Sequence, residues 1–286
     1  MISVEQFEKE LALIIKNGYR EDVGDGDHTS LSCIPSNAKG KANLLVKDTG
    51  VIAGVAFAKK AFTYFDEDLH IESFIDDGSE VSYGDVVFQV SGNSQSILQA
   101  ERFVLNAMQR MSAIATKTNF FVNLLKGTKT QILDTRKTTP GIRALEKWAV
   151  KIGGGVNHRF ALYDMVMIKD NHIDFAGGII EALNSTHTYL KKTKKKLPIE
   201  VETRNLNDVK LILNKGGFQR IMLDNYSIAD TKKAVKLIGN KYEIESSGGI
   251  TEKTIASYAK CGVDFISVGA LTHHVKSLDL SLKAIK

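Results

Sequence analysis

The second half of the chain alternates short apolar runs with polar or glycine-rich segments, most of which lead into a stretch with helical spacing. Six runs follow this order, and they are TQILDTRK, YDMVMIKDNH, LPIEVET, QRIMLDN, YEIESSGGI and VDFISVGALTH. Strands that alternate with helices at this spacing are typical of parallel sheets, because each connection must cross back over the sheet. The pattern predicts an α/β barrel, with a doubly wound open sheet as the alternative.

The first half has a different pattern. Residues 3–17 are predicted to form an amphipathic helix that begins at the N-cap Ser3 and ends at Gly18. Between about residues 41 and 90, turn-forming segments separate four β-rich runs, ANLLV, GVIAGVAF, LHIESFI and DVVFQV. Beyond the polar segment SGNSQS, apolar residues at helical spacing predict one or two helices in residues 97–125. The first half is therefore expected to form a small domain that contains a sheet.

The composition excludes several classes of protein. A chain of 286 residues with 43% hydrophobic residues buries a substantial core, which excludes disorder. The 38 basic residues are nearly matched by 33 acidic ones, so no overall charge favours nucleic acid. The lysine run at residues 191–196 contains no aromatic residue and is expected to be a solvated helix end.

The cellular location is predicted from what the sequence lacks. The first residues have neither the basic region nor the long apolar run of a secretory signal, and no apolar stretch reaches the roughly 20 residues of a membrane span. Cys33 and Cys261 are too few for a disulfide framework, and neither lies in a metal-binding spacing. We expect a cytoplasmic protein without a membrane partner.

Reactive side chains gather at the carboxyl ends of the apolar runs. Arg136 and Lys137 follow ILDT, Lys169 follows MVMI, Asp224 follows IML, and Ser247 follows YEIES. In α/β barrels this end of the strands carries the active site. Any one of these residues alone is explained equally well as a solvated surface group. Their shared position favours a site.

The cations in this set match acidic substrates. Arginine binds carboxylate or phosphate with two parallel hydrogen bonds, whereas lysine offers a mobile point charge, so a mixed set suits a ligand that carries both groups. The loops DTRKTTPG and GGGVNHRF are short and bounded by glycine or proline. The candidate cations are Arg102, Arg136, Lys137, His158, Arg159 and Lys169.

Three acidic residues are candidates for a metal site. Glu200 and Glu202 lie two residues apart on a predicted strand, so both side chains point to the same side. With Asp224 one strand later, Glu202 is expected to hold Mg²⁺ together with substrate phosphates. Salt bridges to nearby cations are the alternative, and the spacing does not decide between Glu200 and Glu202.

Two further segments have simpler predictions. The glycine turn SSGGI precedes a predicted helix, and such turns bind phosphate through exposed backbone N–H groups. His172 in KDNH is expected to orient its loop by hydrogen bonds rather than to catalyse. The acidic segment EDVGDGDHT does not match the spacing of a calcium loop and is expected to be a turn or an interface segment.

Together these motifs resemble those of the quinolinate phosphoribosyltransferases, a family also called decarboxylating nicotinate-nucleotide pyrophosphorylases. The resemblance rests on DTRKTTPG, GGGVNHR and IKDNH in this order, and it extends from EDVGDGDHTS to ISVGALTH. It implies an α/β protein with an N-terminal open α/β sandwich at residues 1–113. An incomplete α/β barrel of six or seven strands would occupy residues 114–274, and the tail 275–286 would pack back on the first domain.

The resemblance also implies a role for each site residue. Lys137, Lys169, Glu202 and Asp224 would be catalytic, and Glu202 and Asp224 would share Mg²⁺ with the substrate. The implied substrate-binding residues are Arg102, Thr135, Arg136, Lys137, His158, Arg159, Lys169, Glu202, Asp224, Ser247, Gly248, Gly249, Gly269 and Ala270. Arg102 would reach the site of a neighbouring subunit, so the implied assembly is at least a homodimer, with a hexamer as the alternative.

The implied reaction joins quinolinate to 5-phosphoribosyl-1-pyrophosphate with loss of CO₂, as a step of NAD biosynthesis. Two other functions compete with it. One is a related phosphoribosyltransferase for another acidic heterocycle, and the other is an inactive anion-binding protein. The complete set of cations and acids argues against both. Only the isoelectric point of about 8.9 and the lysine run would support binding to nucleic acid.

Overall fold

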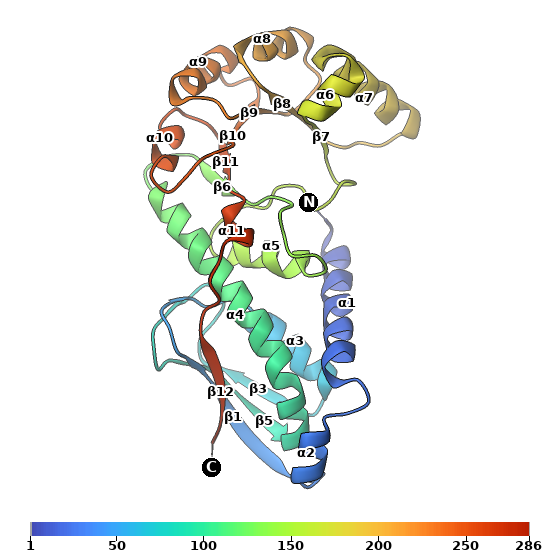
Figure 1. The fold of residues 1–286 in the computed structure, drawn as a ribbon, viewed down its shortest axis with the longest axis vertical. Helices are drawn as coiled ribbons and strands as arrows, with labels where there is room; N and C mark the ends of the chain where they lie inside the picture. Colours follow the sequence, from blue (N-terminus) through green and yellow to red (C-terminus); the bar gives the residue numbers. More distant parts are fainter. Residues whose placement is uncertain (1, 286) are drawn as a thin grey trace. The chain divides into compact units, whose positions relative to one another are not determined.

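Residues 2–285 are described by the structure, a computed structural model (Figure 1). They form two compact units. One unit comprises residues 120–136 and 155–269, and we call it the barrel unit. The other comprises residues 2–119, 137–154 and 270–285, and we call it the sandwich unit. No helix in the described part of the chain is both long and apolar enough to cross a membrane.

The barrel unit is built on one parallel sheet of six strands in the order β6-β11-β10-β9-β8-β7. The strands are β6 (Gln131–Leu133), β7 (Val166–Ile168), β8 (Ile199–Thr203), β9 (Arg220–Asp224), β10 (Glu243–Ser247) and β11 (Phe265–Ser267). All six correspond to strands predicted from the sequence. Between residues 2 and 285 no ladder joins β7 to β6, so the barrel is incomplete.

Helices follow the strands as the alternating pattern predicts. After β7 to β10 come α6 (Asp170–Ala176), α7 (Ile179–Thr193), α8 (Leu206–Lys215), α9 (Ile228–Ile238) and α10 (Ile255–Ala259). They lie on the outer side of the sheet (Figure 1). All five residues of β8 are buried, as expected for a strand of a parallel sheet with both faces covered.

The sandwich unit contains a four-stranded antiparallel sheet in the order β12-β1-β5-β3. Its strands are β1 (Lys39–Val46), β3 (His70–Ser73), β5 (Val86–Asn93) and β12 (Leu280–Ile285), and β2 (Gly50–Val51) pairs separately with β4 (Glu80–Val81). Its helices are α1 (Val4–Val23), α2 (His28–Cys33), α3 (Val55–Phe65), α4 (Ser94–Leu124), α5 (Arg143–Ile152) and α11 (Ala270–His273). An edge-to-face contact of Phe62 with Phe88 packs α3 on β5.

The two units do not follow the single boundary expected after residue 113. Residues 137–154 belong to the sandwich unit because α5 packs closely on its helices: Trp148 contacts Phe7 edge to face at 5.4 Å. Gly153 lies so close to α4 that a Cβ there would be 2.4 Å from the carbonyl oxygen of Ala115. The end of the chain also lies in this unit, where β12 pairs with β1 and Leu282 faces Leu44.

Two sequence predictions in the sandwich unit are wrong. The run GVIAGVAF is not one strand, because only Gly50–Val51 is extended and α3 begins at Val55. The carboxylate of Asp77 accepts hydrogen bonds from the backbone N–H groups of Gly54, Val55 and Ala56, which stabilises the start of that helix.

The predicted end of the first helix at Gly18 is also wrong, because α1 continues to Val23. Gly18 faces the ring of Phe103 closely, and a Cβ at this position would be 2.0 Å from that ring. The glycine is needed for helix packing rather than for termination. In the segment that follows, Asp27 accepts hydrogen bonds from Thr29 N and Ser30 N and caps α2, a helix that the sequence did not predict.

Candidate functional site

Six sequence-predicted residues of the barrel unit lie at the carboxyl ends of its six strands. Each strand contributes one of them: Arg136 follows β6, Lys169 follows β7, Glu202 lies in β8, Asp224 ends β9, Ser247 ends β10, and Gly269 follows β11. Because the strands are parallel, these ends lie on the same edge of the sheet. The structure therefore brings this part of the predicted set to one face of the barrel unit.

Glu202 and Asp224 form an acidic pair on adjacent strands. Glu202 is 7% exposed, and its Oε1 accepts a long hydrogen bond of 3.4 Å from Asp170 N at the start of α6. Burial and the negative charge of Asp224 both raise the pKa of Glu202. Two carboxylates that repel each other at the mouth of a barrel are a suitable donor set for a hard cation such as Mg²⁺.

Glu200 has a different environment from Glu202. Glu200 is fully buried, and its Oε2 lies 2.7 Å from Nε2 of His158. The same nitrogen of His158 is 3.4 Å from Oε2 of Glu245, and Nη1 of Arg220 is 3.4 Å from that oxygen. Glu200 thus belongs to an ionic network of two acids and two cations inside the barrel.

The protonation of His158 depends on this network. Burial alone would lower its pKa, but hydrogen bonds and charge from Glu200 and Glu245 outweigh burial and raise the pKa of His158 to about 9. On the other side of the ring, the backbone N–H of Arg159 donates to Nδ1 and favours the neutral form, a weaker effect than that of two buried carboxylates.

The same three side chains, His158, Glu200 and Glu245, have ligand atoms close enough together to hold a metal ion. The positive charges of His158 and Arg220 already balance the negative charges of the two carboxylates. A protonated imidazole cannot coordinate a metal. The cluster is therefore better explained as an ionic core than as a metal centre. It also means that both ring nitrogens of His158 are engaged within the protein, and its predicted contact with substrate stays a prediction.

Arg136 and Arg159 form the cationic part of the barrel unit's site. Arg136 is exposed, whereas Arg159 is 9% exposed and its Nη1 donates to the carbonyl oxygen of Met165 at 3.2 Å. Burial and the positive charge of Arg136 lower the pKa of Arg159. Two guanidinium groups that repel each other are stabilised by a ligand with two negative charges.

Asp134 positions this region, and sequence reasoning missed it. It is fully buried, its Oδ1 accepts a hydrogen bond from His158 N at 2.8 Å, and its Oδ2 accepts one from Asn157 Nδ2 at 2.7 Å. The carboxylate thereby fixes the loop that carries His158 and Arg159 to the end of β6. The only signal in the sequence is that Asp134 begins the motif DTRK.

The glycine turn after β10 has the backbone geometry of a small anion site. Gly248 and Gly249 have φ values of 88° and 61°, which favour glycine. A Cβ on Gly248 would be 2.2 Å from Oδ1 of Asn225, whereas a Cβ on Gly249 would meet open space. Asn225 N donates to Ser247 O at 2.9 Å and fixes the turn beside the end of β9. These features suit a phosphate group held by backbone N–H groups.

Residues around Lys169 confirm one modest prediction. Nδ1 of His172 accepts a hydrogen bond from Lys169 N at 3.0 Å, so this histidine orients the loop at the start of α6.

Thr135 is half-buried beside Arg136. The lysine run is also as predicted, because α7 ends at Thr193 and the lysines beyond it are exposed.

Three predicted site residues belong to the sandwich unit. Lys137 is exposed and lines a cavity of about 450 Å³ with Arg110, Thr138, Thr139, Thr272 and His273. Burial and the charges of His274 and Lys137 lower the pKa of His273. Ala270 begins α11, and Arg102 is exposed on α4.

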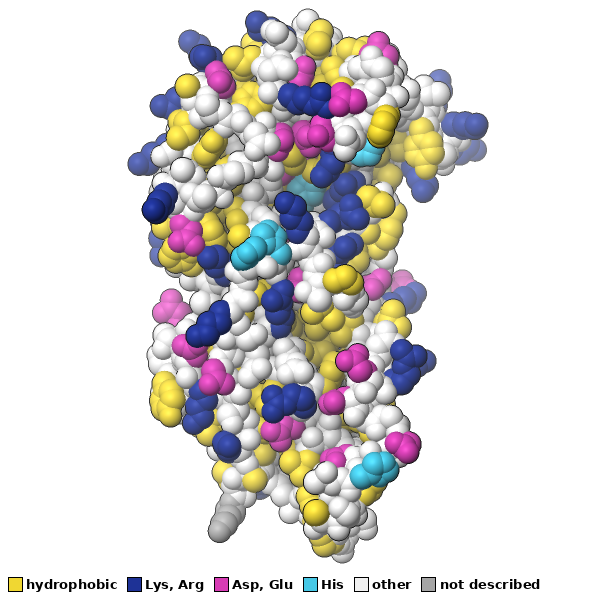
Figure 2. All heavy atoms as spheres, in the orientation of Figure 1, with side chains coloured by type: hydrophobic (Ala, Val, Ile, Leu, Met, Phe, Trp, Pro, Cys, Tyr) yellow, Lys and Arg dark blue, Asp and Glu magenta, His cyan; other side chains and the backbone are white. Residues whose placement is uncertain are grey.

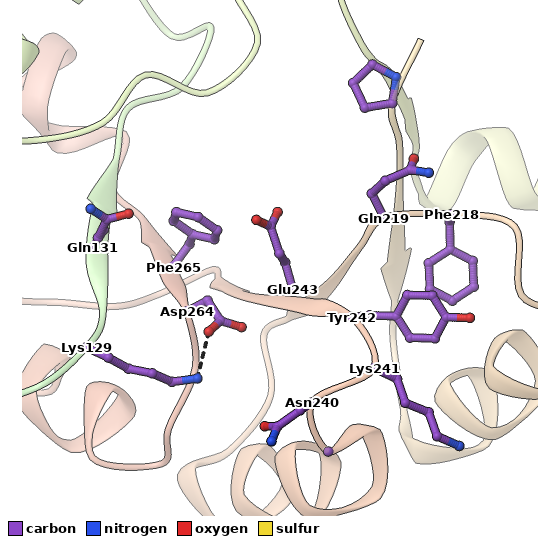
Figure 3. A pocket seen from close by; sticks show the side chains of 12 residues that line it. Lys129, Gln131, Phe218, Gln219, Asn240, Lys241, Tyr242, Glu243, Asp264 and Phe265 are labelled. Atoms are coloured by element: carbon purple, nitrogen blue, oxygen red, sulfur yellow. Dashed lines mark hydrogen bonds and ion pairs between the residues drawn. The ribbon is translucent and has the colours of Figure 1, made fainter. Parts of the chain in front are cut away.

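Another cavity, of about 830 Å³, lies in the barrel unit near the amino ends of its strands (Figure 3). Most of its charged side chains are already paired. Lys129 Nζ is 2.7 Å from Asp264 Oδ1, and Glu243 accepts a hydrogen bond from Arg220 Nη2 at 2.9 Å. The rings of Phe218 and Tyr242 stack on each other at 4.2 Å. These contacts stabilise the end of the barrel at which the strands begin, whereas in this fold the catalytic end is the one at which the strands finish.

Comparisons with known proteins agree with this geometry. The family model for the quinolinate phosphoribosyl transferase N-terminal domain matches residues 27–112, and the model for the C-terminal domain matches residues 114–283. A nicotinate-nucleotide pyrophosphorylase from Oryza sativa is 45% identical over 289 residues, covering 96% of this chain and 77% of its own. A probable nicotinate-nucleotide pyrophosphorylase from Bacillus subtilis is 39% identical, covering 96% of this chain and 93% of its own.

Solved structures give the same result. The crystal structure of NadC from Streptococcus pyogenes has a TM-score of 0.89 and 35% identity, and the match covers 100% of this chain and 99% of that one. The nicotinate-nucleotide pyrophosphorylase from Francisella tularensis has a TM-score of 0.86 and 36% identity, covering 97% and 96% of the two chains. On sequence and fold, this chain belongs to the quinolinate phosphoribosyltransferase family.

Proposed function

We propose that this chain transfers the phosphoribosyl group of 5-phosphoribosyl-1-pyrophosphate to quinolinate and releases CO₂, giving nicotinate mononucleotide for NAD biosynthesis. The observation that carries the proposal is the match of both family domains, at residues 27–112 and 114–283, with a predicted site residue at the end of each barrel strand. In the reaction, the bond from the ribose C1 to pyrophosphate breaks and a bond to the pyridine nitrogen forms. The carboxylate next to that nitrogen then leaves as CO₂, and a proton replaces it.

Quinolinate recognition is assigned to the cations. Arg136 and Arg159 would each bind a pyridine carboxylate, which relieves the repulsion that lowers the pKa of Arg159. His158 stays the third cation proposed for this set, although its charge is already paired with Glu200 and Glu245. Binding both carboxylates orients the ring nitrogen towards the ribose. Positioning of this kind supplies much of the rate enhancement in a reaction without a covalent intermediate.

Phosphate recognition is assigned to the glycine turn and the lysines. Ser247, Gly248 and Gly249 would hold the 5-phosphate, together with the backbone at Gly269 and Ala270. Lys137 and Lys169 would face the pyrophosphate and stabilise its charge as it leaves. The ribosylated ring nitrogen is cationic, so it accepts the electron pair that remains when CO₂ departs.

Mg²⁺ is the cofactor we propose, with Glu202 and Asp224 as its protein ligands. Their mutual repulsion and position at adjacent strand ends fit a hard divalent cation. When bound, such an ion neutralises the pyrophosphate leaving group. The carboxylates themselves also favour positive charge at the ribose C1 as pyrophosphate leaves.

The assembly and location are proposals as well. We propose a homodimer in the cytoplasm, with Arg102 of one subunit serving the site of the other. In support, Arg102 is exposed and forms no ion pair within residues 2–285. Both cysteines are free thiols, which fits a reducing compartment. Basic and acidic side chains are intermixed on the face shown in Figure 2, which supports a small anionic substrate over nucleic acid.

The direct test is to incubate the purified protein with quinolinate, 5-phosphoribosyl-1-pyrophosphate and Mg²⁺. Nicotinate mononucleotide, pyrophosphate and CO₂ are expected in equal amounts. Nucleotide formation from another pyridine or pyrimidine acid, with none from quinolinate, would overturn the proposed substrate.

The metal proposal has its own test. Chelation of divalent ions, Glu202→Gln and Asp224→Asn are each expected to lower kcat at least about a hundredfold, as for loss of one preorganised charged contact. The variants should bind quinolinate like the unchanged protein, because the acids do not contact it in this proposal. Full activity in chelator, or in the double variant, would reject the metal role.

A further inference from the structure

Hydrogen bonds fix the segment from Lys137 to Thr139 to other elements of the sandwich unit. Glu146 on α5 is fully buried, and its Oε2 accepts a hydrogen bond from the backbone N–H of Thr139 at 3.1 Å. Its Oε1 accepts hydrogen bonds from Nε and Nη2 of Arg110 on α4, at 3.0 and 2.9 Å. One buried carboxylate therefore connects this segment to two helices.

Thr272 on α11 completes the connection. Its hydroxyl donates to the carbonyl oxygen of Lys137 at 2.7 Å, and its own carbonyl oxygen accepts a hydrogen bond from Nη2 of Arg110. Thr272 is 1% exposed, so water does not compete for these bonds. Thr138 is held too, because its hydroxyl accepts a hydrogen bond from Nε of Arg143 at 2.9 Å.

The side chain of Lys137 is exposed and lines the cavity that also contains His273 and Arg110. A lysine side chain is flexible, and ordering it on a ligand costs conformational entropy. A fixed backbone reduces that cost and places the ammonium group within a smaller volume.

We propose that Thr272, Arg110 and Glu146 are positioning residues that hold the Lys137 backbone so that its ammonium group meets the pyrophosphate leaving group. This inference rests on the proposed function and adds residues that act through Lys137. Thr272 is the most specific of the three, because its side chain bonds directly to the backbone of Lys137.

Thr272→Val tests the proposal with little change of shape, since it exchanges a hydroxyl for a methyl group. We expect kcat/KM for 5-phosphoribosyl-1-pyrophosphate to fall about tenfold, as for other small displacements of a catalytic group. The Kd for quinolinate should change less than about twofold, because Lys137 does not bind quinolinate in this proposal. Thr272→Ser keeps the hydroxyl and should retain activity within about twofold.

Thr231→Val is the matched control. Thr231 is also fully buried, and its hydroxyl also donates to a backbone carbonyl, that of Ser227 at 2.9 Å. It lies on α9 in the barrel unit. The control should lose similar stability but keep its kinetic constants. If Thr272→Val and Thr231→Val have the same kinetics, the positioning role is wrong.

A double-mutant cycle with Lys137→Ala decides whether the effect passes through the lysine. In a protein that already lacks the ammonium group, Thr272→Val should change kcat/KM less than about twofold. A further tenfold loss in that background would show independent roles and overturn the proposal. If Thr272→Val does not fold, Arg110→Lys replaces it in the same cycle, since lysine cannot reproduce the paired hydrogen bonds to Glu146.

Failure of the inference and failure of the proposed function give different results. If the unchanged protein forms no nicotinate mononucleotide, the proposed function is wrong. If it is active and the cycle shows no coupling, only the positioning role is wrong. Amide hydrogen exchange supplies a readout apart from activity, because Glu146→Gln should accelerate exchange at Thr139 N by at least about tenfold. Unchanged exchange there would contradict the role of Glu146.

Discussion

Residues with similar side chains have different environments in this protein because their neighbours differ. Glu200 and Glu202 lie on the same strand, yet Glu200 pairs with His158 inside the barrel and Glu202 lies beside Asp224 at its mouth. Strand periodicity predicted that both would point to the same side but could not predict their depth. Depth depends on the partners Glu245 and Arg220, which come from other strands.

The cation Arg136 gives the first prediction at this scale. Arg136→Ala should weaken quinolinate binding at least thirtyfold, or about 2 kcal/mol, because a charge-assisted pair of hydrogen bonds is lost. Isothermal titration calorimetry on the folded variant measures this. Arg136→Lys should recover only part of the loss, since lysine cannot form both bonds. Lys129→Ala, at the other end of the barrel, is the control. Near-normal binding by Arg136→Ala would contradict its assignment.

His158 gives a prediction about pH. The pKa of its imidazolium is about 9 in the folded protein, above the ordinary value of 6.5. The folded state therefore binds a proton that the unfolded state has lost, and the stabilisation from this proton is complete below pH 6.5 and is lost as the pH rises through 9. Burial also raises the pKa of Glu200 to about 7, so this carboxyl group adds to the loss as the pH rises to 7. The free energy of unfolding should fall by about 3 kcal/mol over this range. Urea denaturation at several pH values measures it, and His158→Gln should remove most of the dependence.

Among the elements, the strands were more predictable than the helix boundaries. All six barrel strands were predicted because their apolar runs are continuous and each ends in a polar residue. The start of α3 was missed because Asp77, which caps it, is more than 20 residues away in the sequence. Pairing of β12 with β1 likewise joins segments far apart. The resemblance to a family implied that the tail packs back on the first domain, but neither it nor periodicity predicted this strand pairing.

Helix α1 shows how a contact between helices overrides a local signal. Gly18→Ala should increase the intrinsic helix propensity of α1 yet destabilise the protein by about 1 to 3 kcal/mol, because the added methyl group overlaps the ring of Phe103. Thermal or urea unfolding measures the loss. Phe103→Leu in the same chain should recover part of it by making room. Increased stability in Gly18→Ala alone would mean that the two helices do not pack so closely.

At the scale of the whole molecule, the residues predicted to form the site belong to two compact units. The acids, the arginines of the strand ends and the glycine turn belong to the barrel unit, whereas Lys137, Ala270 and Arg102 belong to the sandwich unit. Most of these site residues could be proposed from the sequence because they lie within short contiguous motifs. These motifs could not predict the residues that hold them in place, such as Asp134 and Glu146, because each acts through contacts that only the fold creates.

The proposal that Arg102 serves the partner's site predicts recovery of activity in a mixture of two inactive variants. Arg102→Ala and Arg136→Ala should each be inactive as homodimers. In a mixed dimer, one of the two sites receives Arg136 from the first chain and Arg102 from the second, and is complete. Since random exchange makes half of the dimers mixed, with one complete site of two, about 25% of the unchanged activity should return. The assay follows nicotinate mononucleotide after the two variants are denatured together and refolded. Refolding each variant alone controls for residual activity. If Arg102 instead completed the site of its own chain, every site in every dimer would lack one arginine, and the mixture would stay inactive.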